Sequence, residues 1–206
     1  MNLNDQIVLV TGAGSGLGAA AAIALADAGA DLVLISRTKD ELDKVAEDIE
    51  TKGRIAMMFP TDTADTDAME KLYGAIKKRF GRLDVVFANA GVNGVWAPIE
   101  ELTPDEWDDT IRINLRGTYL TIHHAVPLMK DRGGSIIITS SINGTRTFTT
   151  AGASAYATTK AGQLALGQML ALELAKHRIR VNVICPGAID ASKHISGTPI
   201  WIDGVQ

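Results

Sequence analysis

The sequence has a single cysteine, Cys185, among its 206 residues, and aromatic residues make up only 5% of it. One cysteine excludes an intrachain disulfide and is typical of a chain kept in a reducing compartment. No uninterrupted apolar run approaches the length of a membrane span, and residues 1–10 lack the basic and apolar regions of a secretory signal. We therefore expect a cytoplasmic protein without membrane contact.

An excess of charge of one sign is also missing. Lys and Arg number 20 and Asp and Glu number 24, which gives a net charge of −4. A chain without a basic cluster is not expected to bind nucleic acid, because phosphate recognition needs a basic face. Hydrophobic residues at 46% and charged residues at 21% exclude a disordered or coiled-coil chain. No histidine or cysteine has metal-ligand spacing.

The sequence does contain an alternation of short β-branched runs with longer segments of helical periodicity, which favours a parallel sheet covered by helices. The runs are nearly all apolar, as in strands buried on both faces. We predict one α/β domain over residues 1–206, a Rossmann-type doubly wound parallel sheet with three α/β/α layers. The expected strands are 7–10, 32–35, 55–59, 83–88, 135–139 and 179–184, and the expected helices are 16–29, 38–52, 66–80, 104–131 and 154–177.

The expected helix 104–131 has a well-marked start and a weak interior. Thr103, Pro104 and Glu106 supply an N-cap, a proline at the first helical position and a capping-box acid. Asn114 and Gly117 are poor helix formers. We expect a kink there, caused either by local packing or by a functional requirement.

A glycine-rich turn joins the first strand to the first helix. Glycines let the backbone approach a pyrophosphate, and the free N–H groups and dipole of a helix N-terminus favour its charge. The spacing departs from the common dinucleotide fingerprint, because Leu17 stands where that pattern needs its third glycine. The expected pyrophosphate-binding residues are Gly12, Gly14, Ser15, Gly16, Leu17 and Gly18.

The end of the second strand bears on the choice of cofactor. An acidic residue there would bind a ribose diol, whereas this chain has Ser36 and Arg37. A hydroxyl and a guanidinium suit a 2′-phosphate. We expect NADP(H) to be preferred, with NAD(H) possible; the alternative is that Arg37 is only a solvated residue at the start of a helix.

Tyr156 and Lys160 lie four residues apart in a segment of strong helix formers, so they share a helix face. An ammonium group near a phenol stabilises the phenolate, which makes the tyrosine a usable acid or base. The preceding buried strand ends in Ser140-Ser141, at the edge where a parallel sheet presents its ligand crevice. Ser141 is the expected ligand of a substrate oxygen, with Ser140 and Thr139 as alternatives.

Taken in order, these motifs resemble those of the short-chain dehydrogenases and reductases over nearly the whole chain. The resemblance rests on TGAGSGLG at 11–18, Asp62, NAG at 89–91, Asn114, Ser141, Tyr156 with Lys160, and PG at 186–187.

The resemblance implies roles for these residues. Tyr156 would be the acid in carbonyl reduction or the base in alcohol oxidation, and Lys160 would hold the nicotinamide ribose. Ser141 would bind the substrate oxygen, and Asn114 would anchor a water that relays protons through Lys160. The helix kink at Asn114 would free a backbone carbonyl for that water. The remaining implied cofactor-binding residues are Asp62 at the adenine, Thr63, Asn89, Ala90, Gly91, Pro186, Gly187 and Ile189.

The sequence departs from the family after Asp190, where a mobile helical lid and a further helix would normally precede the last strand. About forty residues are absent, a length at which loops are usually functional or disordered. Either the gene lacks this substrate lid, or the chain is interrupted. We expect a chain break between Asp190 and Ala191, because losing a covering helix would expose a large apolar face.

The expected function is NADP(H)-dependent interconversion of a small-molecule ketone and a secondary alcohol, by a homodimer or homotetramer. One alternative is a sensor or scaffold protein that keeps the fold and the cofactor but has lost catalysis. Another is a nucleotide-dependent transferase such as a methyltransferase, which has no use for a Tyr/Lys pair below a serine.

Overall fold

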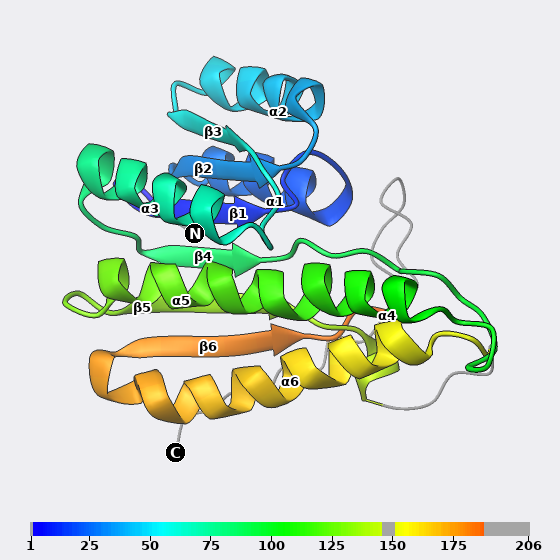
Figure 1. The fold of residues 1–206 in the computed structure, drawn as a ribbon. Helices are drawn as coiled ribbons and strands as arrows, with labels where there is room; N and C mark the ends of the chain where they lie inside the picture. Colours follow the sequence, from blue (N-terminus) through cyan, green and yellow to red (C-terminus); the bar gives the residue numbers. More distant parts are fainter. Residues whose placement is uncertain (1, 146–150, 188–206) are drawn as a thin grey trace.

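The computed structural model describes residues 2–145 and 151–187, and its core is a parallel sheet with the strand order β3-β2-β1-β4-β5-β6 (Figure 1). The doubly wound α/β fold is thereby confirmed. The strands are β1 (Ile7–Thr11), β2 (Asp31–Ser36), β3 (Ala56–Pro60), β4 (Val85–Ala88), β5 (Gly134–Thr139) and β6 (Ile179–Ile184). The helices are α1 (Gly16–Asp27), α2 (Lys39–Thr51), α3 (Thr66–Phe80), α4 (Pro104–Ile111), the π-helix η1 (Arg112–Arg116), α5 (Gly117–Met129), the 3-10 helix η2 (Ile142–Gly144), α6 (Ser154–Leu174) and the 3-10 helix η3 (Ala175–His177).

Two apolar clusters fill the space between the sheet and its helices. Side chains along a strand point alternately to the two faces. In β1, Ile7 and Leu9 therefore join the cluster beneath α3, α5 and α6, while Val8 and Val10 join the cluster beneath α1 and α2. This alternation explains why β1 is buried along its whole length.

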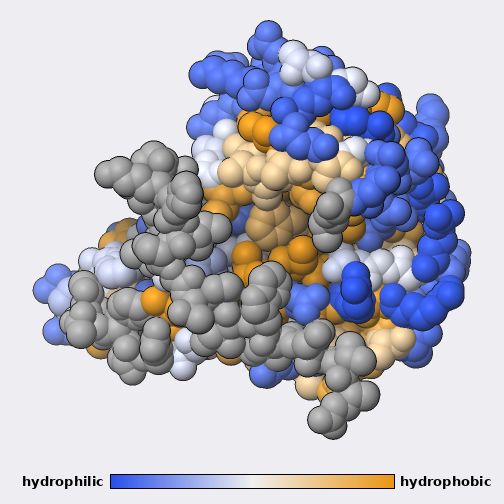
Figure 2. Space-filling model, turned by 180° about the vertical axis from the view of Figure 1, so that it is seen from behind, coloured by the Kyte–Doolittle hydropathy of each residue, from blue (hydrophilic) through white to orange (hydrophobic). Residues whose placement is uncertain are grey.

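The α-helices α5 and α6 pack on β5 and β6, and both lie on one face of the sheet (Figure 1). On the opposite face, α1 and α2 cover β1, β2 and β3. Figure 2 shows apolar surface near the middle of this second face, bordered by hydrophilic side chains. The partly buried Val85, Ile137 and Ile184 pack against the apolar cluster on this side.

The strand order reverses between β1 and β4, which are neighbours in the sheet although they are distant in the sequence. The connections that leave these two strands run in opposite directions, so a crevice opens between them at the carboxyl ends of the strands. The glycine turn follows β1, and the segment from Asn89 follows β4. This edge of the sheet is therefore where the predicted site residues meet.

The prediction of one α-helix over 104–131 is wrong, because the segment is divided into α4, η1 and α5. Its capped start is confirmed: Thr103 and Glu106 form the reciprocal capping box, with Pro104 at the first turn. The expected kink is a π-helix that contains Asn114, and π-turns often occur at functional sites. At Gly117 a Cβ atom would lie 2.6 Å from Thr63 Oγ1, so a larger residue at this point of the helix would displace the Thr63 hydroxyl.

Other boundaries differ from prediction by a few residues at the ends of helices and strands. The last turn of the expected helix 154–177 is the 3-10 helix η3. Arg178 follows η3 and has a φ of 58°. The expected interruption between Asp190 and Ala191 lies outside the described residues. Within 2–145 and 151–187, none of the helices combines the length and hydropathy that crossing a bilayer requires.

We predict opposite stability effects for alanine at two helical glycines. In α6, a Cβ at Gly167 would overlap Val183 Cγ2 on the buried β6, so Gly167→Ala should lower the free energy of unfolding by about 1–3 kcal/mol. In α3, a Cβ at Gly74 meets nothing within 4 Å, so Gly74→Ala should raise it by about 0.5–1 kcal/mol. Urea unfolding measures both. Equal effects of the two substitutions would contradict the packing of α6 on β6.

Candidate functional site

Two cavities of about 360 and 450 Å³ lie at the carboxyl edge of the sheet. Both are lined by Asn89, Gly91 and Val92, so they adjoin along the segment after β4. The first cavity collects the predicted residues Gly12, Ser15, Ser36, Arg37, Asp62, Thr63 and Ala90. The second collects Gly16, Leu17, Ser141, Tyr156, Lys160, Pro186 and Gly187. The loops after all six strands thus contribute to one elongated crevice.

Three of the remaining predicted residues, Gly14, Gly18 and Asn114, do not line either cavity. Gly14 lies against α2, where a Cβ would be 2.7 Å from Glu41 Oε2. Gly18 packs so closely on the turn that a Cβ would overlap the Gly12 carbonyl oxygen. Asn114 is fully buried behind the crevice, and Ile189 lies outside the described residues. Gly14 and Gly18 therefore shape the turn rather than its surface.

The glycine turn fits a bound pyrophosphate. Gly12 and Gly16 have φ angles of 66° and 54°, a region that other residues rarely adopt. Nothing lies within 4 Å of a Cβ built at Gly16, so the turn is open at this point. Ser15 precedes α1 without a capping hydrogen bond from its side chain, and the first turn of α1 carries no acidic residue. Its N–H groups and helix dipole are therefore available to an anion.

Two charged side chains and one hydroxyl lie in the part of the first cavity that follows β2. Ser36 and Arg37 lie there, as predicted, together with Glu41 from the first turn of α2. Among the ion pairs of the described residues, none includes Arg37. Glu41 was missed from the sequence because an acid at a helix start has an ordinary explanation in the helix dipole.

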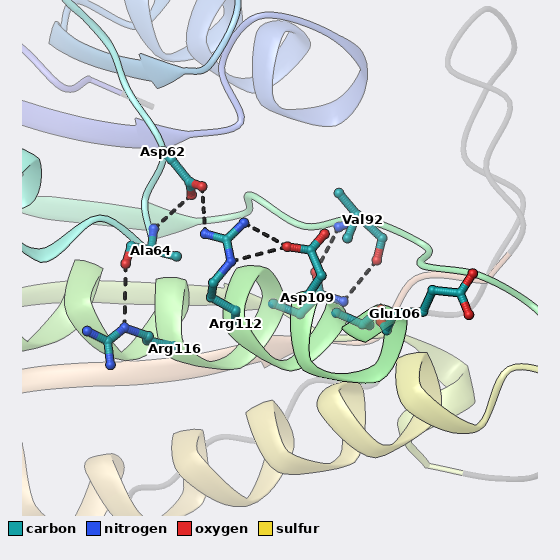
Figure 3. Close-up of polar contacts among 9 residues, drawn as sticks. Asp62, Ala64, Val92, Glu106, Asp109, Arg112 and Arg116 are labelled. Atoms are coloured by element: carbon teal, nitrogen blue, oxygen red, sulfur yellow. Dashed lines mark hydrogen bonds and ion pairs between the residues drawn. The ribbon is translucent and has the colours of Figure 1, made fainter. Parts of the chain in front are cut away.

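Asp62 follows β3 and is held at the same cavity by two donors. Its Oδ1 accepts from the Ala64 N–H at 2.9 Å, and its Oδ2 accepts from Arg112 Nη1 at 2.7 Å (Figure 3). Burial acts to raise the pKa of the Asp62 carboxyl, but these two hydrogen bonds and the Arg112 charge outweigh it and hold the pKa below its ordinary value. Asp62 is therefore ionised at neutral pH.

Asn89 joins the ends of three neighbouring strands. Thr11 Oγ1 accepts from the N–H groups of Asn89 and Ala90, each at 2.9 Å, and the Asn89 amide donates to the Thr11 carbonyl at 3.2 Å. Asn89 Oδ1 accepts from Thr139 Oγ1 at 3.1 Å. These bonds connect β1, β4 and β5 and fix the floor of the crevice.

Asn114 fixes the segment after β4 against α6. Its Oδ1 accepts from the Val92 N–H at 2.7 Å, and its Nδ2 donates to the Val92 carbonyl at 2.9 Å and to Thr159 Oγ1 at 3.1 Å. The side chain therefore satisfies both backbone groups of Val92 and also reaches the residue before Lys160.

The Asn114 carbonyl already has two hydrogen-bond donors, and the water expected at this kink stays a prediction. This oxygen accepts from Gln163 Nε2 at 2.8 Å and from Thr118 Oγ1 at 2.7 Å, which occupies both of its lone pairs. Gln163 is fully buried, and its Oε1 has no hydrogen-bond partner among the described residues. The sequence contained a clue to Gln163, because this glutamine lies about one turn after Lys160 on the face of α6 that packs into the core.

The three hydroxyls at the end of β5 have different partners. Thr139 Oγ1 donates to Asn89, and Ser140 Oγ donates to the Lys160 carbonyl at 2.6 Å. Ser141 Oγ accepts from the Asn143 N–H at 3.2 Å, and none of the described residues accepts its hydrogen. Ser141 is therefore the hydroxyl of the three that is free to donate into the second cavity.

Tyr156 and Lys160 lie on the first turns of α6 beside Ser141. Lys160 Nζ is 5.5 Å from the centre of the Tyr156 ring and donates to the Thr139 carbonyl at 2.9 Å. Burial lowers the pKa of the Lys160 ammonium from its ordinary 10.5 to about 8. A phenol, a hydroxyl and an ammonium group thus line one cavity, and the cavity lined by the glycine turn adjoins it.

Comparison with known proteins agrees with this geometry. The family described as short chain dehydrogenase matches residues 6–197. The chain belongs to this family. This short-chain dehydrogenase is 38% identical to (-)-trans-carveol dehydrogenase of Rhodococcus erythropolis, over 90% of this chain and 71% of the relative. It is an NAD(P)-dependent oxidoreductase.

Solved structures give the same result. The structure of a 3-ketoacyl-ACP reductase from Sinorhizobium meliloti 1021 is 53% identical with a TM-score of 0.87, covering 93% of this chain and 75% of that one. A short chain dehydrogenase from Burkholderia cenocepacia J2315 in complex with NADP is 34% identical with a TM-score of 0.87, covering 92% and 77%. Other similar structures hold NAD.

We predict that burial of Lys160 makes the stability of the cofactor-free short-chain dehydrogenase depend on pH. Between pH 8 and 10.5 the unfolded chain keeps a proton that the folded chain loses, so stability rises with pH. Relative to Lys160→Met, the wild type should gain on the order of 3 kcal/mol across this range. Urea unfolding at each pH measures the difference. The exposed Lys130→Met is the control, and a Lys160→Met difference as constant as that of the control would contradict the prediction.

Proposed function

We propose that this protein is an NADP(H)-dependent oxidoreductase that interconverts a ketone and a secondary alcohol, with Tyr156 as the acid and base. The observation that carries the proposal is that Tyr156, Lys160 and Ser141 line one cavity, which adjoins a second cavity lined by the glycine turn and Arg37. This arrangement supports proton transfer by Tyr156 beside a dinucleotide bound at the glycine turn. The bound nicotinamide would supply or accept the hydride.

The side chains of the second cavity account for the movement of the proton. In reduction, Tyr156 gives its proton to the carbonyl oxygen of the substrate, while Ser141 donates a hydrogen bond to the charge that develops there. In oxidation, the ionised Tyr156 takes the proton from the alcohol. Because the hydroxyls of Thr139 and Ser140 are bound elsewhere, Ser141 alone of the three orients the substrate oxygen.

Lys160 stabilises the negative charge that Tyr156 carries after it has given up its proton. Its ammonium lies near the Tyr156 ring and is fixed by the Thr139 carbonyl. Opposite charges attract more strongly in a buried site than in water. Lys160 also faces the segment after β4, because a Cβ at Gly91 would lie 3.5 Å from its Nζ. It would therefore contact the nicotinamide ribose as well.

The preference for NADP(H) is supported by the side chains in the part of the first cavity that follows β2. Arg37 and Ser36 line the first cavity, and a guanidinium can form paired hydrogen bonds with a phosphate such as the 2′-phosphate of NADP(H). NAD(H) remains the second cofactor of the proposal, because similar structures hold either dinucleotide.

The protein as a whole would act on small molecules in the cytoplasm as a homodimer or homotetramer. Support for the oligomer comes from exposed apolar residues on α5 and α6, among them Tyr119, Met169 and Leu172, which are 49%, 54% and 71% exposed. A face of this kind often marks a protein interface. The cytoplasmic location rests on the low cysteine content alone.

We predict that Tyr156→Phe lowers kcat for ketone reduction with NADPH by about 10²–10⁴-fold, because the reaction loses its general acid. NADPH affinity should stay within about two-fold of wild type, since the ring that packs beside Lys160 remains. A panel of ketones measures turnover, and NADPH fluorescence measures binding. Tyr119→Phe, on the exposed face of α5, is the matched control. A wild type that binds NADPH but reduces no ketone would instead favour the sensor alternative.

We further predict that Arg37→Met weakens NADPH binding by about 10–100-fold and leaves NADH binding nearly unchanged, because only NADPH carries the 2′-phosphate. Titration of both dinucleotides into the two proteins tests this. Arg132→Met, in the loop at the opposite edge of the sheet, is the control. Equal weakening of NADPH and NADH by Arg37→Met would refute the role of Arg37 in cofactor choice.

A further inference from the structure

Arg112 is the first residue of η1 and lies between two carboxylates (Figure 3). Its Nη1 donates to Asp62 Oδ2 at 2.7 Å, while its Nε and Nη2 donate to Asp109 Oδ1 at 3.1 and 2.8 Å. The guanidinium is thus bound on two of its edges, which fixes its plane. Isolated surface pairs contribute little to stability, but a planar fork held on both sides restricts the orientation of the groups it binds.

Asp62 is the only one of the three that lines the first cavity, and its side chain is 28% exposed. A carboxylate offers about four acceptor positions on its two oxygens. Ala64 and Arg112 occupy one position on each oxygen. The unoccupied positions can therefore accept a hydrogen bond from a ligand in the cavity, and an ionised carboxylate can act only as an acceptor.

We propose that Arg112 is a positioning residue for the purine of the cofactor: its guanidinium fixes the Asp62 carboxylate so that Asp62 accepts a hydrogen bond from an exocyclic amino group. The proposal rests on the proposed function, because it needs a dinucleotide in the first cavity. As a consequence, the Asp62 carboxylate would select adenine over hypoxanthine. An adenine presents an amino donor to Asp62, whereas a hypoxanthine presents a carbonyl oxygen that a carboxylate repels.

The segment that bears Asp62 is tied to the helix independently of Arg112. Arg116 Nη2 donates to Thr66 Oγ1 at 2.8 Å, and its Nε donates to the Ala64 carbonyl at 3.4 Å. The close approach of Gly117 to Thr63 holds the same segment. Removing Arg112 should therefore leave the segment in place and free only the Asp62 carboxylate. Arg116→Met is the matched control, since it removes a guanidinium that binds the same segment but not Asp62.

The test compares the affinities for NADPH, or NADH if the wild type binds that cofactor, and for the same dinucleotide with hypoxanthine in place of adenine. The wild type should bind the adenine form about ten-fold more tightly or better. Arg112→Met should reduce this ratio several-fold, and Arg116→Met should leave it unchanged. If Arg112→Met does not fold, Arg112→Lys replaces it, because a single ammonium cannot hold both carboxylates and should also reduce the ratio.

A double-mutant cycle shows whether Arg112 acts through Asp62. Asp62→Ala should abolish the preference for adenine, and adding Arg112→Met to it should then change nothing. An unchanged ratio in Arg112→Met, or an effect of Arg112→Met that persists without Asp62, would overturn the proposal while leaving the proposed function intact. A wild type that binds neither dinucleotide would overturn the proposed function itself.

Discussion

The pair of hydrogen bonds between the Asn114 side chain and the backbone of Val92 holds the crevice together. Val92 belongs to the segment that both cavities share, and Asn114 also binds Thr159, the residue before Lys160. One buried amide therefore sets the position of the segment after β4 relative to the first turns of α6. This contact therefore holds together the two segments that line the adjoining first and second cavities.

The π-helix η1 is what makes the contact possible. A π-turn leaves backbone carbonyls without their usual partners in the helix, and buried carbonyls need others. At Asn114 these partners are the side chains of Thr118 and Gln163. An unpaired carbonyl in a low-dielectric interior is costly, and Gln163 Nε2 removes this cost at Asn114, although Gln163 Oε1 itself has no partner among the described residues. Gln163 therefore fastens α6 to η1 where the helix hydrogen bonds are interrupted.

The features that can be predicted from the sequence are those whose pattern lies within a short stretch of residues. The six strands, the glycine turn and the capping box at Thr103 each depend on residues close together in the chain, and the structure contains them all. Sequence reasoning failed for Arg112 and Gln163, whose partners Asp62 and Asn114 lie about fifty positions away. An arginine in an exposed helix has too many ordinary explanations to be assigned a partner. The glutamine was a better clue, because burying an amide requires partners.

The charges around the first cavity depend on one another. Asp62 is a negative group at a site proposed to bind a phosphate, and alone it would attract the Arg37 guanidinium, whose charge helps to lower the pKa of Asp62. Arg112 supplies Asp62 with a closer partner at 2.7 Å, and Asp109 in turn balances Arg112. Because interactions between exposed charges weaken with distance and screening, the nearer pair dominates. No ion pair of the described residues includes Arg37, so its donors remain for the proposed 2′-phosphate. The proposed recognition of the purine and of the 2′-phosphate would therefore both depend on the same arginine of η1.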